Sequence, residues 1–100
     1  MATETTQAAE KVLKVLNTLL RNFAVGFTNR ELAEATGLNP SDITRYVKTL
    51  EKCGFAERVP ETERIRVSHR MARHAVTILH SLDAAKGRID ESITRITTPL

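Results

Sequence analysis

Apolar side chains recur at helical spacing near the start of the chain. From about Gln7 to Phe23, steps of one and three residues separate the apolar positions, which places them on one face of an amphipathic helix. These positions are Ala9, Val12, Leu13, Leu16, Leu19, Leu20 and Phe23. Gly26 ends the pattern, and residues 27–28 are expected to form a short strand or a turn.

A second, shorter helix is predicted to begin at Thr28. The residues Thr28-Asn-Arg-Glu31 form a capping box, in which the threonine hydroxyl and the glutamate carboxylate each accept from the other residue's backbone N–H group. Gly37 is expected to end this helix in the left-handed conformation.

A third helix is predicted directly after this turn. Asn39 is a good N-cap, Pro40 suits the first helical turn, and Gly54 ends the pattern. The expected buried stripe is Ile43, Val47 and Leu50, which Cys53 would extend. A short helix, a tight turn containing glycine and a second helix are the signature of a helix-turn-helix.

Beyond Gly54 the pattern is that of strands. Residues 55–59 and 64–67 are predicted to be two short strands, joined by a turn over residues 60–63. The side chains expected to face the core are Phe55, Val59, Ile65 and Val67, although Glu57 falls on the same side as the first two. A two-stranded hairpin is not stable alone, so this one is expected to pack against the helices as a wing.

The last third of the chain carries a heptad pattern. Ser68 can cap a helix that continues to about Thr97. Along one seam of this helix, steps of three and four residues alternate, and seven of the eight positions are apolar. The seam consists of Ala72, Ala75, Leu79, Leu82, Lys86, Ile89, Ile93 and Ile96.

Two readings of this helix are open. Val76 and Ile78 widen the apolar stripe in the first half, which indicates packing there on the rest of the chain. The isoleucine seam of the second half needs a cover, and a second copy of the chain is the favoured one. The alternative is a helix folded back onto its own body. Lys86, followed by Gly87, weakens the middle of the seam and would fix its register or hinge the helix.

The positive charge of the chain is concentrated in its middle. The net charge is +3, and residues 40–75 hold eight basic and five acidic side chains, whereas residues 1–39 and 76–100 are each balanced. Clustered positive charge is typical of a protein with a polyanionic partner, and a solvated mixed-charge surface is the alternative.

The composition narrows the class of protein. The 100 residues are 41% hydrophobic, with one cysteine, which excludes an intramolecular disulfide. The sequence shows neither a run of membrane-spanning length nor a signal peptide, so a soluble, cytoplasmic protein is expected.

The sequence from about residue 9 to 71 resembles the N-terminal DNA-binding domain of the IclR family. The segments RELAEATGL and ITRYVKTLEKCGF carry most of the resemblance. It implies a mainly α winged helix-turn-helix over residues 7–67, with three helices and a two-stranded wing. Residues 68–98 would add a long C-terminal helix, a coiled-coil dimerisation segment. The implied function is sequence-specific regulation of transcription, usually as a dimer or tetramer.

The chain departs from that family in three ways. Family members usually carry a large C-terminal effector-binding domain, for which no sequence remains here, so a small-molecule effector is not expected. Glu63 stands in the wing turn where glycine is usual, so the turn is expected to need no positive φ there. Asp42 places a negative charge close to where phosphates should lie.

The third helix is the expected reader of DNA. Ser41, Thr44 and Arg45 are placed for base edges, and arginine is the best bidentate reader of guanine. The residues expected to contact phosphate are Lys48, Thr49 and Lys52, together with Arg30. Arg64, helped by Arg58 or Arg66, would contact phosphate or the minor groove from the wing, and Asn39 completes the predicted surface.

Two neighbours of these residues have competing interpretations. Asp42 could accept from a cytosine amine, but complementing the helix dipole is favoured. Tyr46 could stack on a base or bond a phosphate, but a half-buried ring is favoured.

The sequence gives little support for catalysis, a cofactor or a metal site. The three histidines, His69, His74 and His80, are five and six residues apart, whereas two ligands on one helix face need a step of four. No cofactor and no enzymatic activity are expected. The function favoured is a homodimeric regulator of transcription, a repressor, on an inverted repeat of double-stranded DNA, and such a protein would be nucleoid-associated. A winged-helix protein-interaction module and a DNA-binding architectural or replication accessory factor are the alternatives.

Overall fold

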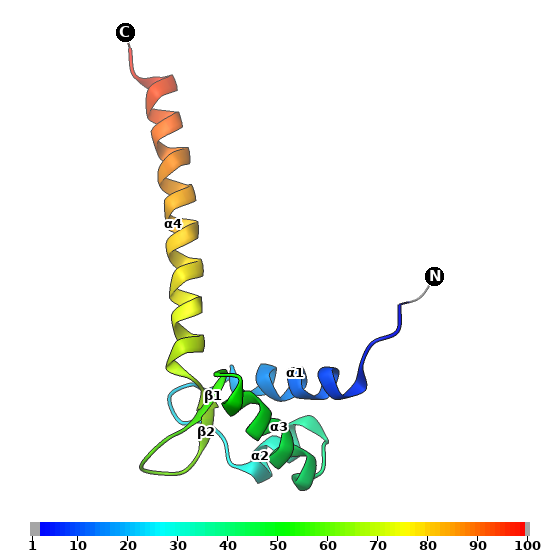
Figure 1. Cartoon of the computed structure of the whole chain (residues 1–100). Helices are drawn as coiled ribbons and strands as arrows, with labels where there is room; N and C mark the ends of the chain where they lie inside the picture. The colour runs from blue at the N-terminus through cyan, green and yellow to red at the C-terminus, as the bar shows by residue number, and fades with distance from the viewer. Residues whose placement is uncertain (1–2, 100) are drawn as a thin grey trace.

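The computed structural model describes residues 3–99 and has a small helical body from which one long helix projects (Figure 1). The elements in chain order are α1 (Gln7–Leu19), α2 (Asn29–Thr36), α3 (Pro40–Lys52), β1 (Ala56–Arg58), β2 (Ile65–Val67) and α4 (His69–Thr97). The predicted fold class is confirmed: three helices, a two-stranded antiparallel wing and a long C-terminal helix.

Helix α1 ends four residues earlier than the apolar pattern predicted. After Leu19 the chain turns, and the Asn22 side chain accepts from the Val25 N–H at 3.1 Å while its carbonyl accepts from the Gly26 N–H at 3.0 Å. These local bonds compete with the helical ladder. They lead into Phe27, which exchanges two backbone hydrogen bonds of 2.7 Å with Ile65 and so adds a single bridge beside the wing.

Helices α2 and α3 begin and end where their caps predicted. The Thr28 hydroxyl accepts from the Glu31 N–H at 3.1 Å, and the Glu31 carboxylate accepts from the Thr28 N–H at 2.8 Å. Gly37 adopts φ 74°, and the Asn39 side chain caps α3 by accepting from the Asp42 N–H.

The core lies between the three helices and the inner face of the wing. Its buried apolar residues are Val15, Leu19, Leu32, Ile43, Val47, Leu50, Ala56, Ile65 and Val67. The predicted stripe of α3 is therefore confirmed, except that Cys53 is exposed. Cys53 follows the last residue of α3 as its C-cap, where the chain already turns toward β1.

The wing corrects the predicted inner face of its first strand. Ala56 pairs with Val67 and Glu57 with Arg66, and paired residues of an antiparallel ladder lie on the same face. Ala56 is therefore the inward residue, and Phe55 is 38% exposed. Glu57 faces outward with Arg66, so it no longer conflicts with the pattern.

The wing turn also differs from its prediction. Glu63 has φ 60°, in the left-handed region that was expected to be avoided there. The Glu63 N–H donates to the Val59 carbonyl at 2.8 Å, so the backbone closes the turn in the glycine-like conformation despite the side chain.

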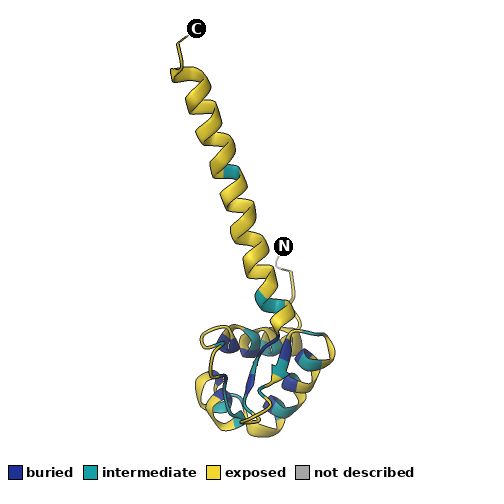
Figure 2. Ribbon diagram, turned by 90° about the vertical axis from the view of Figure 1, so that its left-hand side faces the viewer, coloured by how far each residue is buried: buried dark blue, intermediate teal, exposed yellow. Residues whose placement is uncertain are grey.

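Helix α4 leaves the body at its first turn. Ser68 caps it by accepting from the Met71 N–H at 3.0 Å, and the same hydroxyl donates to the Gly54 carbonyl at 2.7 Å. The 29 residues of α4 then continue without a buried side chain (Figure 2). The radius of gyration is 19.7 Å, whereas a compact domain of this size has about 13 Å.

The expected packing of α4 on the body is therefore wrong. Val76 and Ile78 are exposed, and α4 does not fold back onto the rest of the chain. Helix α4 contacts the body near its first turn, where Met71 packs against the core. Within residues 3–99, no helix combines the length and the apolar composition needed to cross a membrane.

Candidate nucleic-acid interface

The side of α3 opposite its buried stripe forms an open polar surface. Ile43, Val47 and Leu50 face the core. The side chains left exposed on the other side are Ser41, Arg45, Lys48, Thr49 and Lys52, with Thr44 half-buried beside them. Three of these are cations on one short helix, and this face of α3 is not covered by another described element.

The first turn of α3 carries a hydrogen-bonded network. The Asn39 side-chain oxygen accepts from the Asp42 N–H at 2.9 Å and from the Ser41 hydroxyl at 2.7 Å. The Asp42 carboxylate accepts from the Asn39 amide at 3.0 Å and from the Arg45 guanidinium at 2.9 Å. Asn39, Ser41 and Arg45 are thus brought together, and Asp42 lies at their centre.

Thr44 connects α3 to α2. Its hydroxyl donates to the Pro40 carbonyl at 3.1 Å and accepts from the Asn29 amide at 3.0 Å. The Asn29 side-chain oxygen is buried without a hydrogen-bond partner among the described residues. Asn29 was not among the residues predicted from the sequence. The only indication of a role was its position at the start of α2, the helix that precedes the predicted DNA-reading helix.

Arg30 lies on the exposed side of α2. Its guanidinium pairs with Glu34 at 3.2 Å, one helical turn away, and its side chain is 89% exposed. Such an exposed pair contributes little to stability, so Arg30 can exchange Glu34 for another anion.

The three wing arginines are each held by contacts within the protein. Arg64 bonds the Glu31 carboxylate and the Gly26 carbonyl, and its side chain is 24% exposed. Arg66 pairs with Glu57 at 2.8 Å and lies over the Phe23 ring, with 16% of its side chain exposed. Arg58 is freer: it donates to the Glu63 carbonyl at 3.2 Å, and its nearest carboxylate oxygen, on Glu51, is 3.9 Å away.

Two carboxylates that anchor the wing have lowered pKa values. The hydrogen bond from the Thr28 backbone N–H is the main cause that lowers the pKa of Glu31 below its ordinary 4.5, helped by the charge of Arg64 against the opposing effect of burial. Burial raises the pKa of Glu57, but hydrogen bonds from the His69 backbone N–H, Arg66 and the His69 ring outweigh it and leave the pKa below 4.5. Both groups are therefore anions that hold arginines in place.

Tyr46 is half-buried, as the favoured interpretation of this residue expected. The Tyr46 ring packs partly against the core, with the Arg45 guanidinium 5.7 Å from its centre. His69 bonds Glu57 at 2.9 Å. Across residues 3–99, histidine, cysteine and carboxylate side chains form no cluster that could hold a metal ion.

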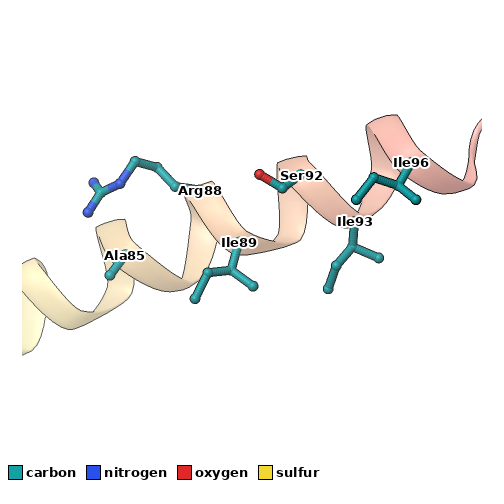
Figure 3. A pocket seen from close by; sticks show the side chains of 6 residues that line it. All are labelled: Ala85, Arg88, Ile89, Ser92, Ile93 and Ile96. Atoms are coloured by element: carbon teal, nitrogen blue, oxygen red, sulfur yellow. The ribbon is translucent and has the colours of Figure 1, made fainter.

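A second exposed surface lies along α4. All the large apolar residues of the predicted seam are exposed: Leu79, Leu82, Ile89, Ile93 and Ile96. Toward the end of the helix, Ile89, Ile93 and Ile96 line a shallow open hollow with Ala85, bordered by Arg88 and Ser92 (Figure 3).

Comparison with known proteins agrees with this geometry. The family model of the IclR helix-turn-helix domain matches residues 8–60, more than half of the chain. The chain belongs to the IclR family. The match covers α2, α3, β1 and all but the first residue of α1, so this IclR-type domain contains the helix-turn-helix of the family.

A solved structure shares the fold of this IclR-type domain. The crystal structure of HmgR from Pseudomonas aeruginosa is 26% identical, with a TM-score of 0.68 over 81% of the present chain. The chain spans only about a third of that protein's length, 33%. Among curated proteins, none matches the chain.

Proposed function

We propose that this protein is a sequence-specific, double-stranded DNA-binding repressor of transcription that acts as a homodimer on an inverted repeat. The observation that carries the proposal is the open face of α3, where Arg45, Lys48 and Lys52 stand clear of the body on the helix that follows the turn of a helix-turn-helix. A helix of this kind fits the major groove with its N-terminal residues toward the bases.

The residues divide by their distance from the start of α3. Ser41, Thr44 and Arg45 lie in its first turns and would read base edges. Lys48, Thr49 and Lys52, further along, would contact phosphates, and Arg30 would add a contact from α2. Asn39 supports Ser41 through a hydrogen bond and would act at the entry to the groove.

The wing is assigned a smaller part in this proposal. Arg58 is the wing arginine with the weakest internal contacts, so it is the best placed to contact phosphate or the minor groove. Arg64 and Arg66, bound to Glu31 and Glu57, would mainly hold the wing in position and reach DNA only by giving up these partners.

Dimerisation would follow from α4. The seam of Ala72, Ala75, Leu79, Leu82, Lys86, Ile89, Ile93 and Ile96 leaves a long apolar strip in water unless another surface covers it. A second α4 matches its length and heptad spacing. Residues 7–67 would then bind DNA and residues 68–98 would join the two copies, so that two-fold symmetry dictates an inverted repeat. A dimer bound across a promoter would block access to it, which favours repression.

The decisive experiment is selection of bound fragments from a pool of random duplex DNA at a fixed salt concentration. The expected result is an inverted repeat with one half-site for each copy. Arg45→Ala should relax the choice at one base pair of each half-site and weaken binding there by about tenfold or more. Lys48→Ala should weaken binding to all sequences alike and lower the salt dependence of binding by about one ion.

Arg95→Ala is the matched control, because Arg95 is an exposed arginine near the far end of α4. It should leave both affinity and sequence choice unchanged. Equal, weak binding of the wild-type protein to every duplex would overturn the proposal and favour an architectural role or a protein partner.

A further inference from the structure

Asp42 occupies an unexpected place for an acidic residue on a DNA-reading helix. Its side chain lies between two polar neighbours: one carboxylate oxygen accepts from the Asn39 amide at 3.0 Å, and the other accepts from the Arg45 guanidinium at 2.9 Å. The Asp42 carboxylate is 24% exposed, whereas the Arg45 side chain is 71% exposed. The acid is thus set back, and the arginine extends beyond it.

The position of Asp42 itself is fixed by the cap of α3. Its backbone N–H donates to the Asn39 side-chain oxygen at 2.9 Å, while its carboxylate receives the amide of the same asparagine. This reciprocal pair holds the carboxylate at the first turn of the helix, where a negative charge is also favoured by the helix dipole. Asp42 is therefore a rigid support for whatever it binds.

Arg45 receives that support and a second contact. One of its terminal nitrogens is bonded to Asp42, and its guanidinium carbon lies 5.7 Å from the centre of the Tyr46 ring. An unrestrained arginine loses much rotamer freedom when it pairs with a base. Contacts made before DNA arrives reduce that loss, provided that they leave the other nitrogens free to donate.

The charge of Asp42 has an opposite effect on DNA in general. A carboxylate beside the phosphate-facing side chains of α3 repels every duplex, whatever its sequence. The same group therefore disfavours all sites and aids only those at which Arg45 finds its partner base. Specificity is the difference between these two affinities, and a repulsive element increases it.

We infer that Asp42 is a specificity-determining residue that acts through Arg45: it holds the guanidinium in one orientation for a guanine and penalises duplexes that lack this base at that position. The inference rests on the proposed function. It makes Asp42 a positioning residue, distinct from a reader of cytosine and from a simple helix cap.

The test compares dissociation constants for three duplexes at one salt concentration: the selected site, the site with the Arg45 base pair changed, and an unrelated sequence. In Asp42→Ala and Asp42→Asn, binding to the unrelated duplex should tighten several-fold. The ratio between the selected and the changed site should fall by about tenfold. Asp42→Asn keeps the shape of the side chain and one oxygen for the Asn39 amide, but it replaces the charged oxygen that Arg45 uses. It therefore covers the case in which the alanine variant folds poorly.

Glu34→Gln is the matched control for charge. It removes one negative charge from the neighbouring helix α2 without contacting Arg45. It should tighten binding to all three duplexes and leave their ratio unchanged. A ratio that falls equally in this variant would assign the effect to net charge and overturn the role of Asp42.

The double variant Asp42→Ala, Arg45→Ala separates positioning from direct contact. If Asp42 acts through Arg45, removing it changes no sequence preference once Arg45 is absent. A further loss of preference in that background would mean that Asp42 touches a base itself. A wild-type protein without any selected site would defeat the proposed function, whereas a wild-type site with an unchanged ratio in both single variants would defeat only this inference.

Discussion

Glu63 carries the one left-handed backbone conformation among the non-glycine residues described. A side chain at φ 60° crowds the following carbonyl, and the cost is roughly 1–2 kcal/mol for an ordinary L-residue. The wing keeps this conformation because the Glu63 N–H closes the turn on Val59 and its carbonyl accepts from Arg58. Both bonds use only the backbone atoms of Glu63, so neither depends on its side chain.

Glu63→Gly should therefore stabilise the protein. The backbone contacts remain, the crowding disappears, and part of the gain is offset by the greater freedom of glycine in the unfolded chain. The expected increase in the free energy of unfolding is about 0.5–1 kcal/mol, measured by urea denaturation. Glu61→Gly, in the same turn but without a positive φ, should give no increase, and an equal gain in both variants would contradict the strain argument.

Glu57 joins the wing to α4 through one carboxylate. It accepts from Arg66 on β2 and from the His69 backbone N–H in the first turn of α4, at 2.9 Å. These bonds outweigh burial and leave its pKa below the ordinary 4.5. A carboxylate with a lowered folded-state pKa stabilises the fold above its unfolded pKa, and this contribution is lost as the pH falls through the folded value.

Glu57→Gln should lower the free energy of unfolding at neutral pH by roughly 1–2 kcal/mol. The difference between wild type and variant should shrink as the pH falls below 4.5, because the wild-type carboxyl is then protonated too. Urea denaturation at neutral pH and at about pH 3 checks this. The exposed Glu61→Gln should show no such trend, and a difference that is constant with pH would contradict it.

At the scale of elements, the segment after α1 and strand β2 approach each other closely at Gly26. Gly26 has φ 78°, and a Cβ there would lie 2.6 Å from the Ile65 carbonyl oxygen. The same carbonyl accepts the hydrogen bond from the Phe27 N–H. The two segments can therefore approach this closely only because residue 26 is a glycine, which has no Cβ. Gly37 at the end of α2 has a similar φ of 74° but open space around it.

The two glycines make a matched pair. Gly37→Ala should lower the free energy of unfolding by about 1 kcal/mol, because alanine is strained in the left-handed conformation. Gly26→Ala has that cost plus a clash with backbone, so it should lose about 2–4 kcal/mol in total. Thermal or urea unfolding of both variants measures the difference. Equal losses would mean that the segment before Phe27 can move away from β2 without penalty.

The bounds of an element could be predicted from the sequence where the contacts that fix them join residues close together in the chain. The starts of α2, α3 and α4 were predicted because Thr28, Asn39 and Ser68 each bond a backbone N–H group three residues away. The end of α1 was not, because the turn that leads to Phe27 serves a pairing with Ile65 far along the chain. The inward residue of β1 depended in the same way on its register with β2.

The candidate site shows the same division. The exposed side of α3 followed from the spacing of Ile43, Val47 and Leu50, which are buried as predicted. The partners of its side chains did not, since the contact of Thr44 with Asn29 and that of Arg64 with Glu31 join residues distant in sequence. The sequence thus indicates which face of α3 is exposed. The fold determines which side chains near that face already have hydrogen-bond or ion-pair partners within the protein.

At the scale of the whole molecule, α4 is the feature on which the proposed dimer depends. It spans about 43 Å at 1.5 Å per residue, and its isoleucine seam lies in water. Parallel pairing of two such helices would bring both bodies to one end, where their α3 helices can face adjacent turns of the same duplex. Antiparallel pairing would leave them at opposite ends.

Ile93→Asp should separate the two copies. A charge buried in an apolar seam has no partner, so dimer affinity should fall by at least about a hundredfold, as measured by sedimentation equilibrium. Ala84→Asp is the control, because Ala84 lies outside the seam on the same helix and is exposed. Binding to the inverted repeat should weaken with Ile93→Asp alone. A wild-type monomer at micromolar concentration would contradict the dimer.

Only one residue, Ser68, stands between the last residue of β2 and the first of α4. The Ser68 hydroxyl is bonded at once to Gly54 at the end of α3 and to the first turn of α4. Helix α4 is therefore joined to the body by a short connection that is hydrogen-bonded on both sides. A tilt of about 5° would move its far tip by about 4 Å. A change in the direction of α4 would act first on Ser68 and, through its hydrogen bond, on Gly54, two residues beyond the end of α3.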